Sequence, residues 1–164
     1  MKTLYLVRHA KSSWDDPKLD DFERPLNERG LKDAPRMGRR LSDKGVSPDL
    51  IISSPAARAI ATAKLISEEL GYSKKNIQQA RAMYHAGPGN LLDEIRKVDD
   101  KYETLVMVGH NPGITEFAND LLKESIGNIP TAGVVAGNLK INTWKETEFG
   151  CGKLLFFDFP KNKS

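Results

Sequence analysis

The sequence predicts a single α/β domain, in which a mostly parallel, doubly wound sheet carries helices on both faces. Three short apolar runs, at 4–7, 50–52 and 104–108, have the length of buried strands. Helical patterns fill the intervals between them, and strands that alternate with helices are typical of such a sheet. A chain of 164 residues is long enough for one domain with one core. We expect this domain to span residues 1–160 and to be followed by a short polar tail at 161–164.

The clearest helical pattern runs from residue 55 to about residue 70, with alanine and aliphatic side chains on one stripe. Ser54 is expected to cap its N-terminus, with Pro55 in the first helical position. Further helices are expected over 27–44 and after Pro88 and Pro112. Additional strands are expected at Tyr84–His85, 133–141 and 153–159, and the last two of these finish the sheet.

Composition excludes several classes of protein. The formal charge is +3, from 25 basic and 22 acidic side chains, which is too balanced to indicate a nucleic-acid partner. Cys151 is the single cysteine, so an internal disulfide framework is excluded. No apolar stretch approaches the ~20 residues of a membrane span, and Arg8 interrupts the N-terminal apolar run, so no secretory signal is expected. These features predict a cytoplasmic protein with no membrane partner.

The three apolar runs end in side chains suited to binding phosphate. Arg8 and His9 follow the first run, Arg58 begins the helix after the second, and His110 follows the third. The carboxyl ends of parallel strands meet at one edge of a sheet, where such folds bind ligands, so we expect these four residues to lie together. A cation in a first helical turn opposes the helix dipole, and a phosphate bound between them removes the conflict.

Each of these residues also has a simpler interpretation. Arg8 and His9 fit an ordinary loop, and Arg58 fits a solvated helix face. Two histidines at strand ends also suggest a metal centre. A hydrolytic zinc site normally has three protein ligands, and these motifs supply no third histidine or carboxylate. The neighbouring arginines disfavour a cation, so no metal is expected.

Taken together, the motifs resemble those of the histidine phosphatase superfamily related to phosphoglycerate mutase, and most closely its short SixA-like branch of phosphohistidine phosphatases. The resemblance covers nearly the whole chain. It is carried by Arg8-His9-Ala10-Lys11, by Arg24-Pro25-Leu26-Asn27 with Gly30, by Ser54-Pro55-Ala56-Ala57-Arg58-Ala59 with Thr62-Ala63, and by Gly109-His110-Asn111. It implies a phosphoglycerate mutase-like fold and cofactor-independent chemistry.

The resemblance also implies roles for four residues. His9 matches the nucleophile, and Arg8, Arg58 and His110 match the residues that bind the phosphoryl group. The chemistry of the side chains agrees, because a neutral imidazole can attack phosphorus and form a phosphohistidine intermediate. Guanidinium groups match phosphate oxygens in geometry and charge. His110, if protonated, adds a third donor.

The residue that protonates the leaving group is less apparent. Larger relatives carry a glutamate after the strand that matches 77–83, where this chain has Tyr84 and His85. We expect Asp21 to act as the general acid, with Glu23 as the second choice, because both precede the Arg24 motif and can fold back over the site. Alternatively, these two carboxylates are solvated charges of a surface loop with no part in the site.

The roles of two further side chains near the expected site are left open. Lys11 stands at the mouth of the expected site and His85 in a loop that would cover it, and each fits a solvated role or a role in the site.

The absence of the glutamate favours a substrate whose leaving group is easily protonated. Phosphohistidine is such a substrate, since its nitrogen takes up a proton more readily than an alkoxide does. The sequence therefore predicts a phosphatase that acts on phosphohistidine in a protein. A phosphatase of small phosphorylated metabolites is the alternative, and a non-catalytic module that binds phosphoproteins ranks below both.

Overall fold

The computed structural model describes residues 1–162 and contains a six-stranded sheet in the order β3-β2-β4-β1-β5-β6. The first four strands are parallel to one another, whereas β5 runs antiparallel to both β1 and β6. The mixed sheet is therefore mostly parallel, as predicted. The strands are β1 (Lys2–Arg8), β2 (Leu50–Ser53), β3 (Gln78–Gln79), β4 (Thr104–Gly109), β5 (Val134–Leu139) and β6 (Gly152–Asp158).

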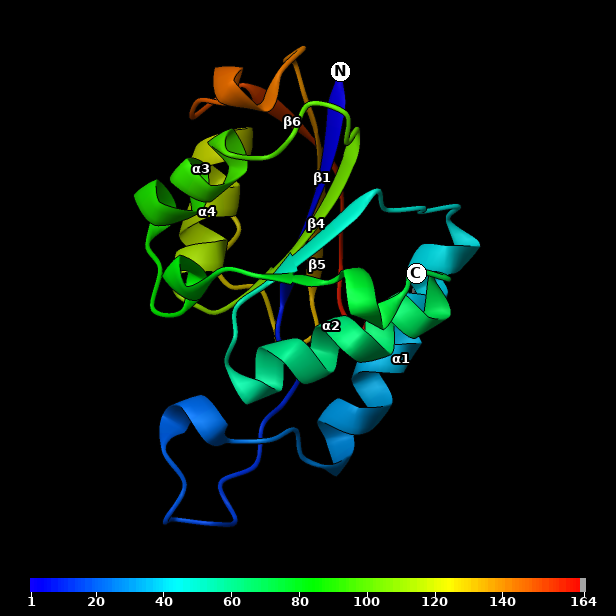
Figure 1. Cartoon of the computed structure of the whole chain (residues 1–164), viewed down its shortest axis with the longest axis vertical. Coiled ribbons are helices and arrows are strands. Elements are labelled where there is room, and N and C mark those ends of the chain that lie inside the picture. The colour runs from blue at the N-terminus through cyan, green and yellow to red at the C-terminus, as the bar shows by residue number, and fades with distance from the viewer. Residues whose placement is uncertain (163–164) are drawn as a thin grey trace.

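Helices cover both faces of the sheet, which confirms the predicted fold class. The pair α1 and α2 lies on one side and the pair α3 and α4 on the other (Figure 1). Each pair buries its own apolar cluster against the strands. The α-helices are α1 (Glu28–Asp43), α2 (Ala57–Glu69), α3 (Pro88–Arg96) and α4 (Gly113–Leu122), and the 3₁₀ helices are η1 (Asp21–Glu23), η2 (Lys74–Asn76), η3 (Arg81–Met83) and η4 (Trp144–Glu146).

The expected strand at Tyr84–His85 is wrong. The edge of the sheet is formed instead by the two residues of β3, and Tyr84 and His85 lie in the loop before α3. His85 has a φ of 58°, a left-handed conformation that a strand does not contain. This turn directs the loop across the carboxyl edge of the sheet.

The predicted start of α2 is also wrong. The helix begins at Ala57, and its N-cap residue, Ala56, makes no side-chain cap. The Ser54 hydroxyl bonds no N–H group within the helix. It accepts the N–H of Ala56, the residue before the helix, at 3.2 Å and lies 2.8 Å from His110 Nε2. Tertiary contacts thus replace the local cap that the sequence pattern suggested.

Helix α1 packs directly on the loop that follows β1. The Asn27 side chain caps the helix by accepting the Gly30 N–H at 2.9 Å, and the Asn27 N–H donates to the Lys11 carbonyl at 3.0 Å. A β-carbon on Gly30 would overlap that carbonyl. A larger residue at this position would therefore push α1 away from the loop.

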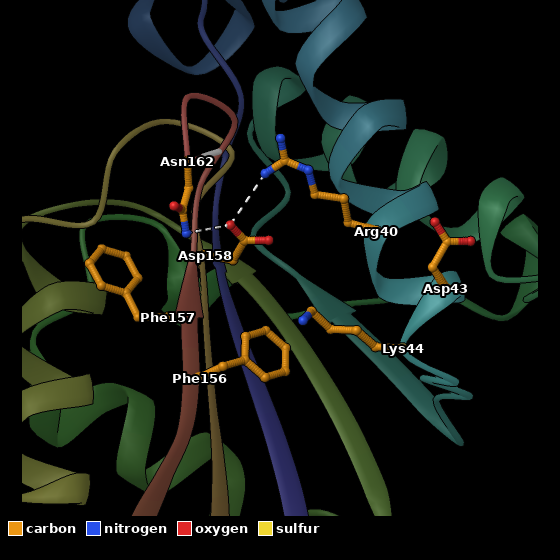
Figure 2. Close-up of a pocket in the computed structure, with 7 residues that line it drawn as sticks. All are labelled: Arg40, Asp43, Lys44, Phe156, Phe157, Asp158 and Asn162. Atoms are coloured by element: carbon orange, nitrogen blue, oxygen red, sulfur yellow. Dashed lines mark hydrogen bonds and ion pairs between the residues drawn. The ribbon is translucent and has the colours of Figure 1, made fainter. Parts of the chain in front are cut away.

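The end of the described chain is attached to α1. Figure 2 shows Arg40 of α1 reaching Asp158 at the end of β6, at 3.2 Å. Arg40 also donates to the carbonyls of Phe159 and Pro160, at 2.8 and 3.0 Å. A cavity of about 300 Å³ lies beside this ion pair. Of the expected tail, Lys161 and Asn162 are described, and residues 163–164 lie outside the described residues.

Within residues 1–162, no helix is both long and apolar enough to cross a membrane.

Candidate active site

Three parallel strands bring the predicted site residues to one edge of the sheet. Arg8 pairs with Gly109 at the ends of β1 and β4, so His9 and His110 follow neighbouring strands. Their ring centroids are 5.1 Å apart. Arg58 comes from the first turn of α2, which follows β2 on the other side of β4. The segment between β1 and α1 extends beyond this end of the sheet (Figure 1).

The surroundings of His9 hold its ring in a defined tautomer. Its Nδ1 atom lies 2.7 Å from the Ala10 carbonyl, and because a carbonyl only accepts, Nδ1 carries the proton. The neutral ring then keeps its lone pair on Nε2. Burial, together with the charges of Arg58 and Arg8, lowers the pKa of His9 to about 4 despite that hydrogen bond. His9 is therefore neutral near pH 7, in the form that attacks phosphorus.

Thr62 connects the loop that carries His9 to the helix that carries Arg58. Its Oγ1 accepts the Ala10 N–H at 2.9 Å and donates to the Arg58 carbonyl at 2.8 Å. Thr62 and Ala10 are both fully buried, so water does not replace these bonds. The connection holds His9 and Arg58 in a fixed relative position.

Three buried polar atoms in the site have no hydrogen-bond partner among the described residues. They are Arg8 Nε, Arg58 Nε and His110 Nδ1. Their residues line one cavity of about 250 Å³ together with His9. Unpaired buried polar groups are costly and are normally satisfied by protein, water or ligand. The arrangement can donate hydrogen bonds to the oxygens of a phosphoryl group bound beside His9.

Asp21 lies at the centre of a charged network with Arg24 and Arg58, two of the residues that line this cavity. Its Oδ2 accepts bonds from Arg58 at 2.9 Å and from the Tyr84 hydroxyl at 2.7 Å. Its Oδ1 accepts from Arg24 Nε and Nη2, at 3.2 and 3.1 Å. Arg24 also donates to Ser12 Oγ at 2.7 Å and stacks 3.4 Å above the ring of exposed Trp14.

This network keeps Asp21 ionised. Burial raises the pKa of its carboxyl group, but the hydrogen bonds from Tyr84 and Arg58 and the charge of Arg58 outweigh burial. The result is a pKa well below the usual range of an aspartate. Glu23, the second candidate acid, is exposed and lines neither cavity of the site.

A second cavity adjoins the first. It has a volume of about 470 Å³ and shares Arg58 and His110 with the smaller cavity. Asp21 and His85 also line it, whereas Lys11 lines the smaller cavity. The ring of Tyr84 contacts both histidines, with centroids 3.9 Å from His85 and 5.6 Å from His110. The site therefore has one chamber at His9 and another beside it.

His110 is held in its neutral form. Burial and the neighbouring His9 and Arg58 lower its pKa to about 3. The protonated donor considered from the sequence is thus not the form that this site favours near pH 7. Among residues 1–162, no group of three or more His, Cys, Asp or Glu side chains could hold a metal ion.

Comparison with known proteins identifies the family. The model of the histidine phosphatase superfamily (branch 1) matches residues 4–84. Beyond that match, the fold agrees over nearly the whole chain with SixA structures. The chain belongs to the histidine phosphatase superfamily, in its SixA-like branch, and is a phosphatase that acts on phosphorylated substrates.

Three relatives illustrate the range of similarity. An uncharacterized chloroplastic protein of Arabidopsis thaliana is 33% identical over an alignment of 153 residues, and the alignment covers 88% of this chain and 70% of the relative. A structure from Agrobacterium tumefaciens, assigned as the phosphohistidine phosphatase SixA, has a TM-score of 0.83 at 27% identity, covering 97% of this chain and 98% of its own. The tungstate complex of the protein histidine phosphatase SixA has a TM-score of 0.82 at 16% identity, covering 96% and 97%, and shows the fold alone.

Several site residues were not assigned a role from the sequence. Arg24 belongs to a motif noted in the sequence, but its bonds to Asp21 depend on the fold of the loop. Tyr84 was expected in a strand, and its hydroxyl instead reaches Asp21. Ser54 was interpreted as a helix cap and lies against His110. Ser54 and Thr62 were detectable as family motif residues, whereas their bonds to His110 and to the Ala10 N–H join segments that are distant in the sequence.

Proposed function

We propose that the protein removes the phosphoryl group from phosphohistidine in a partner protein, with His9 as nucleophile. One observation carries the proposal: His9 Nε2 has a free lone pair in a cavity lined by three residues with unpaired buried polar atoms. A similar protein assigned as a phosphohistidine phosphatase supports this choice of substrate.

The reaction proceeds in two displacements. Nε2 of His9 attacks phosphorus, the bond from phosphorus to the substrate nitrogen breaks, and the leaving imidazole takes up a proton. Arg8, Arg58 and His110 bind the non-bridging oxygens in both steps. Water then attacks phosphorus on His9, the bond from phosphorus to Nε2 breaks, and inorganic phosphate, which keeps the protons of the water, leaves the neutral imidazole of His9 regenerated.

Asp21 is the proposed general acid, and binding of the substrate favours its protonation by solvent. The Asp21 carboxylate and the incoming phosphoryl group share Arg58. A second negative charge at this position disfavours the ionised carboxylate and raises its pKa. Asp21 then takes up a proton and delivers it to the leaving group, and Glu23 is the second choice. A nitrogen leaving group demands less of this acid than an alkoxide does.

A phosphatase of small metabolites is the second candidate. The adjoining cavity of about 470 Å³ favours it, because that volume accommodates a small leaving group. Both candidates use the same phosphoryl site and the same nucleophile. The two candidate functions differ in the leaving group that occupies the larger cavity, which Asp21 lines.

The test compares phosphate release from a phosphotransfer domain that carries phosphohistidine with release from a panel of small phosphate esters. We expect a much higher kcat/KM for the phosphoprotein, lost in His9→Ala. A preference for one ester would establish the metabolite phosphatase instead. Binding of the phosphoprotein without release of phosphate would refute both activities and indicate a binding module.

The role of Asp21 has its own test. Asp21→Asn is expected to lower kcat by 10²- to 10⁴-fold on an alkyl phosphate, roughly the range of general acid catalysis. The same variant is expected to lose little on 4-nitrophenyl phosphate, whose leaving group needs no proton. Glu23→Gln is the matched control and is expected to retain both activities. Equal losses on the two esters would assign Asp21 to binding, and a loss confined to Glu23→Gln would exchange their roles.

A further inference from the structure

Ser54 occupies a buried position between the sheet and His110. It follows β2 directly and is fully buried. Its Oγ lies 2.8 Å from His110 Nε2, and the Ala56 N–H donates to the same oxygen at 3.2 Å. The proposed mechanism does not use this hydroxyl group.

A count of protons determines the direction of the bond between Ser54 and His110. The hydroxyl has one proton to donate, and one of its lone pairs already receives the Ala56 N–H. Within the described residues, His110 Nε2 is the acceptor within reach of that proton. If Nε2 were protonated and donated to Oγ, the serine proton would lack an acceptor in a buried site. Such an unsatisfied donor is unfavourable.

We propose that Ser54 is a positioning residue that donates to His110 Nε2 and so fixes the neutral ring in the tautomer with its proton on Nδ1. His110 Nδ1 is buried and has no partner among the described residues. In this tautomer it presents an N–H group that a phosphoryl oxygen can accept. This consequence rests on the proposed function, in which His110 binds the phosphoryl group.

The tautomer matters because the site already contains several cations. Arg8, Arg24 and Arg58 line the same cavity as His110, so a fourth positive charge is disfavoured. A neutral ring with its proton on Nε2 would direct that proton at Ser54 and offer only a lone pair at Nδ1. Ser54 therefore allows His110 to donate without becoming charged.

The first experiment observes the tautomer directly. Long-range ¹H–¹⁵N NMR spectra of the full-length protein distinguish the two neutral tautomers of histidine. The chain has 3 histidines, and His85→Gln and His110→Gln assign their signals. We expect the Nδ1–H form for His110 in the wild type and a shift toward the Nε2–H form in Ser54→Ala. An Nε2–H form in the wild type, or an unchanged tautomer in Ser54→Ala, would overturn the proposal.

Ser53→Ala provides the matched control. Ser53 is also fully buried, and its hydroxyl donates to the Ser54 carbonyl at 2.8 Å rather than to a histidine. The tautomer of His110 is therefore expected to stay unchanged in Ser53→Ala. A shift equal to that of Ser54→Ala would assign the effect to local packing and refute the role of the hydroxyl.

The second experiment measures the consequence for catalysis on 4-nitrophenyl phosphate. Ser54→Ala is expected to lower kcat about tenfold, somewhat less than the loss on deleting a transition-state donor outright, and Ser54→Thr, which keeps the hydroxyl, to restore it. Unchanged kcat in Ser54→Ala would refute the catalytic consequence. If the wild type were inactive and still showed the Nδ1–H form, the proposed function would fail while the tautomer assignment stood.

Discussion

Thr62→Val tests whether the Thr62 side chain joins the loop that carries His9 to the helix that carries Arg58. The substitution keeps the shape of the side chain and removes the hydroxyl that bonds the Ala10 N–H and the Arg58 carbonyl. Both Thr62 and Ala10 are fully buried. The Ala10 N–H is thus left without a partner.

The expected cost in stability follows from these two bonds. The unsatisfied Ala10 N–H costs about 1–3 kcal/mol, and loss of the bond to the Arg58 carbonyl costs about 1 kcal/mol. We therefore expect the free energy of unfolding to fall by about 2–4 kcal/mol. For a domain of this size the melting temperature falls by about 5–15 °C. Because His9 and Arg58 lose their fixed relative position, kcat/KM is expected to fall by roughly 10- to 100-fold at temperatures where the variant is folded.

Urea denaturation and phosphatase kinetics measure the two effects separately. The matched control is Ser67→Ala in the same helix, because Ser67 is also fully buried and its hydroxyl bonds only the Lys64 carbonyl, at 2.8 Å. This control is expected to lose less than about 1 kcal/mol and to keep its activity. If Thr62→Val matched Ser67→Ala in both measurements, the reasoning from the two bonds would be refuted.

Three further predictions concern acid stability, the C-terminal attachment and the loop over the site. The pKa of His9 falls from 6.5 to about 4 on folding, so between these pH values the unfolded chain binds a proton at His9 and the folded chain does not. The free energy of unfolding therefore falls as the pH is lowered from 6.5 toward 4. His9→Gln should therefore lose less stability than the wild type between about pH 7 and about pH 5 in urea titrations, and an equal loss would contradict this. Arg40→Ala removes bonds to Asp158 and two carbonyls. It should lower the free energy of unfolding by about 1–3 kcal/mol while phosphatase activity stays unchanged, and a lower kcat would show that this attachment reaches the site. Gly113→Ala places a β-carbon on the Ala86 carbonyl, and should lower both the melting temperature and kcat by displacing the loop before α3; a variant with wild-type values would refute this.

Much of the fold was predictable from local sequence. The buried strands of the parallel sheet are apolar because both of their faces are covered, and this leaves an apolar run that is readable without a structure. The stop residues and prolines located the helices to within a few residues. The edge strand β3 was not predictable, since two exposed glutamines carry no periodic signal. Tyr84 and His85 were misassigned to a strand for a different reason, because no glycine marks the left-handed turn at His85.

The sequence by itself predicted that the proposed site residues lie together, because His9, the two arginines and His110 stand at the ends of strands and the start of a helix. Their protonation states were decided by the tertiary structure. Burial keeps His9 and His110 neutral, and two arginines with Tyr84 keep Asp21 ionised. The contacts of Ser54 with His110 and of Thr62 with the Ala10 N–H form only when segments far apart in the sequence come together. A residue's chemistry is local, but its pKa and its hydrogen-bond partners depend on neighbours that the fold brings from elsewhere in the chain.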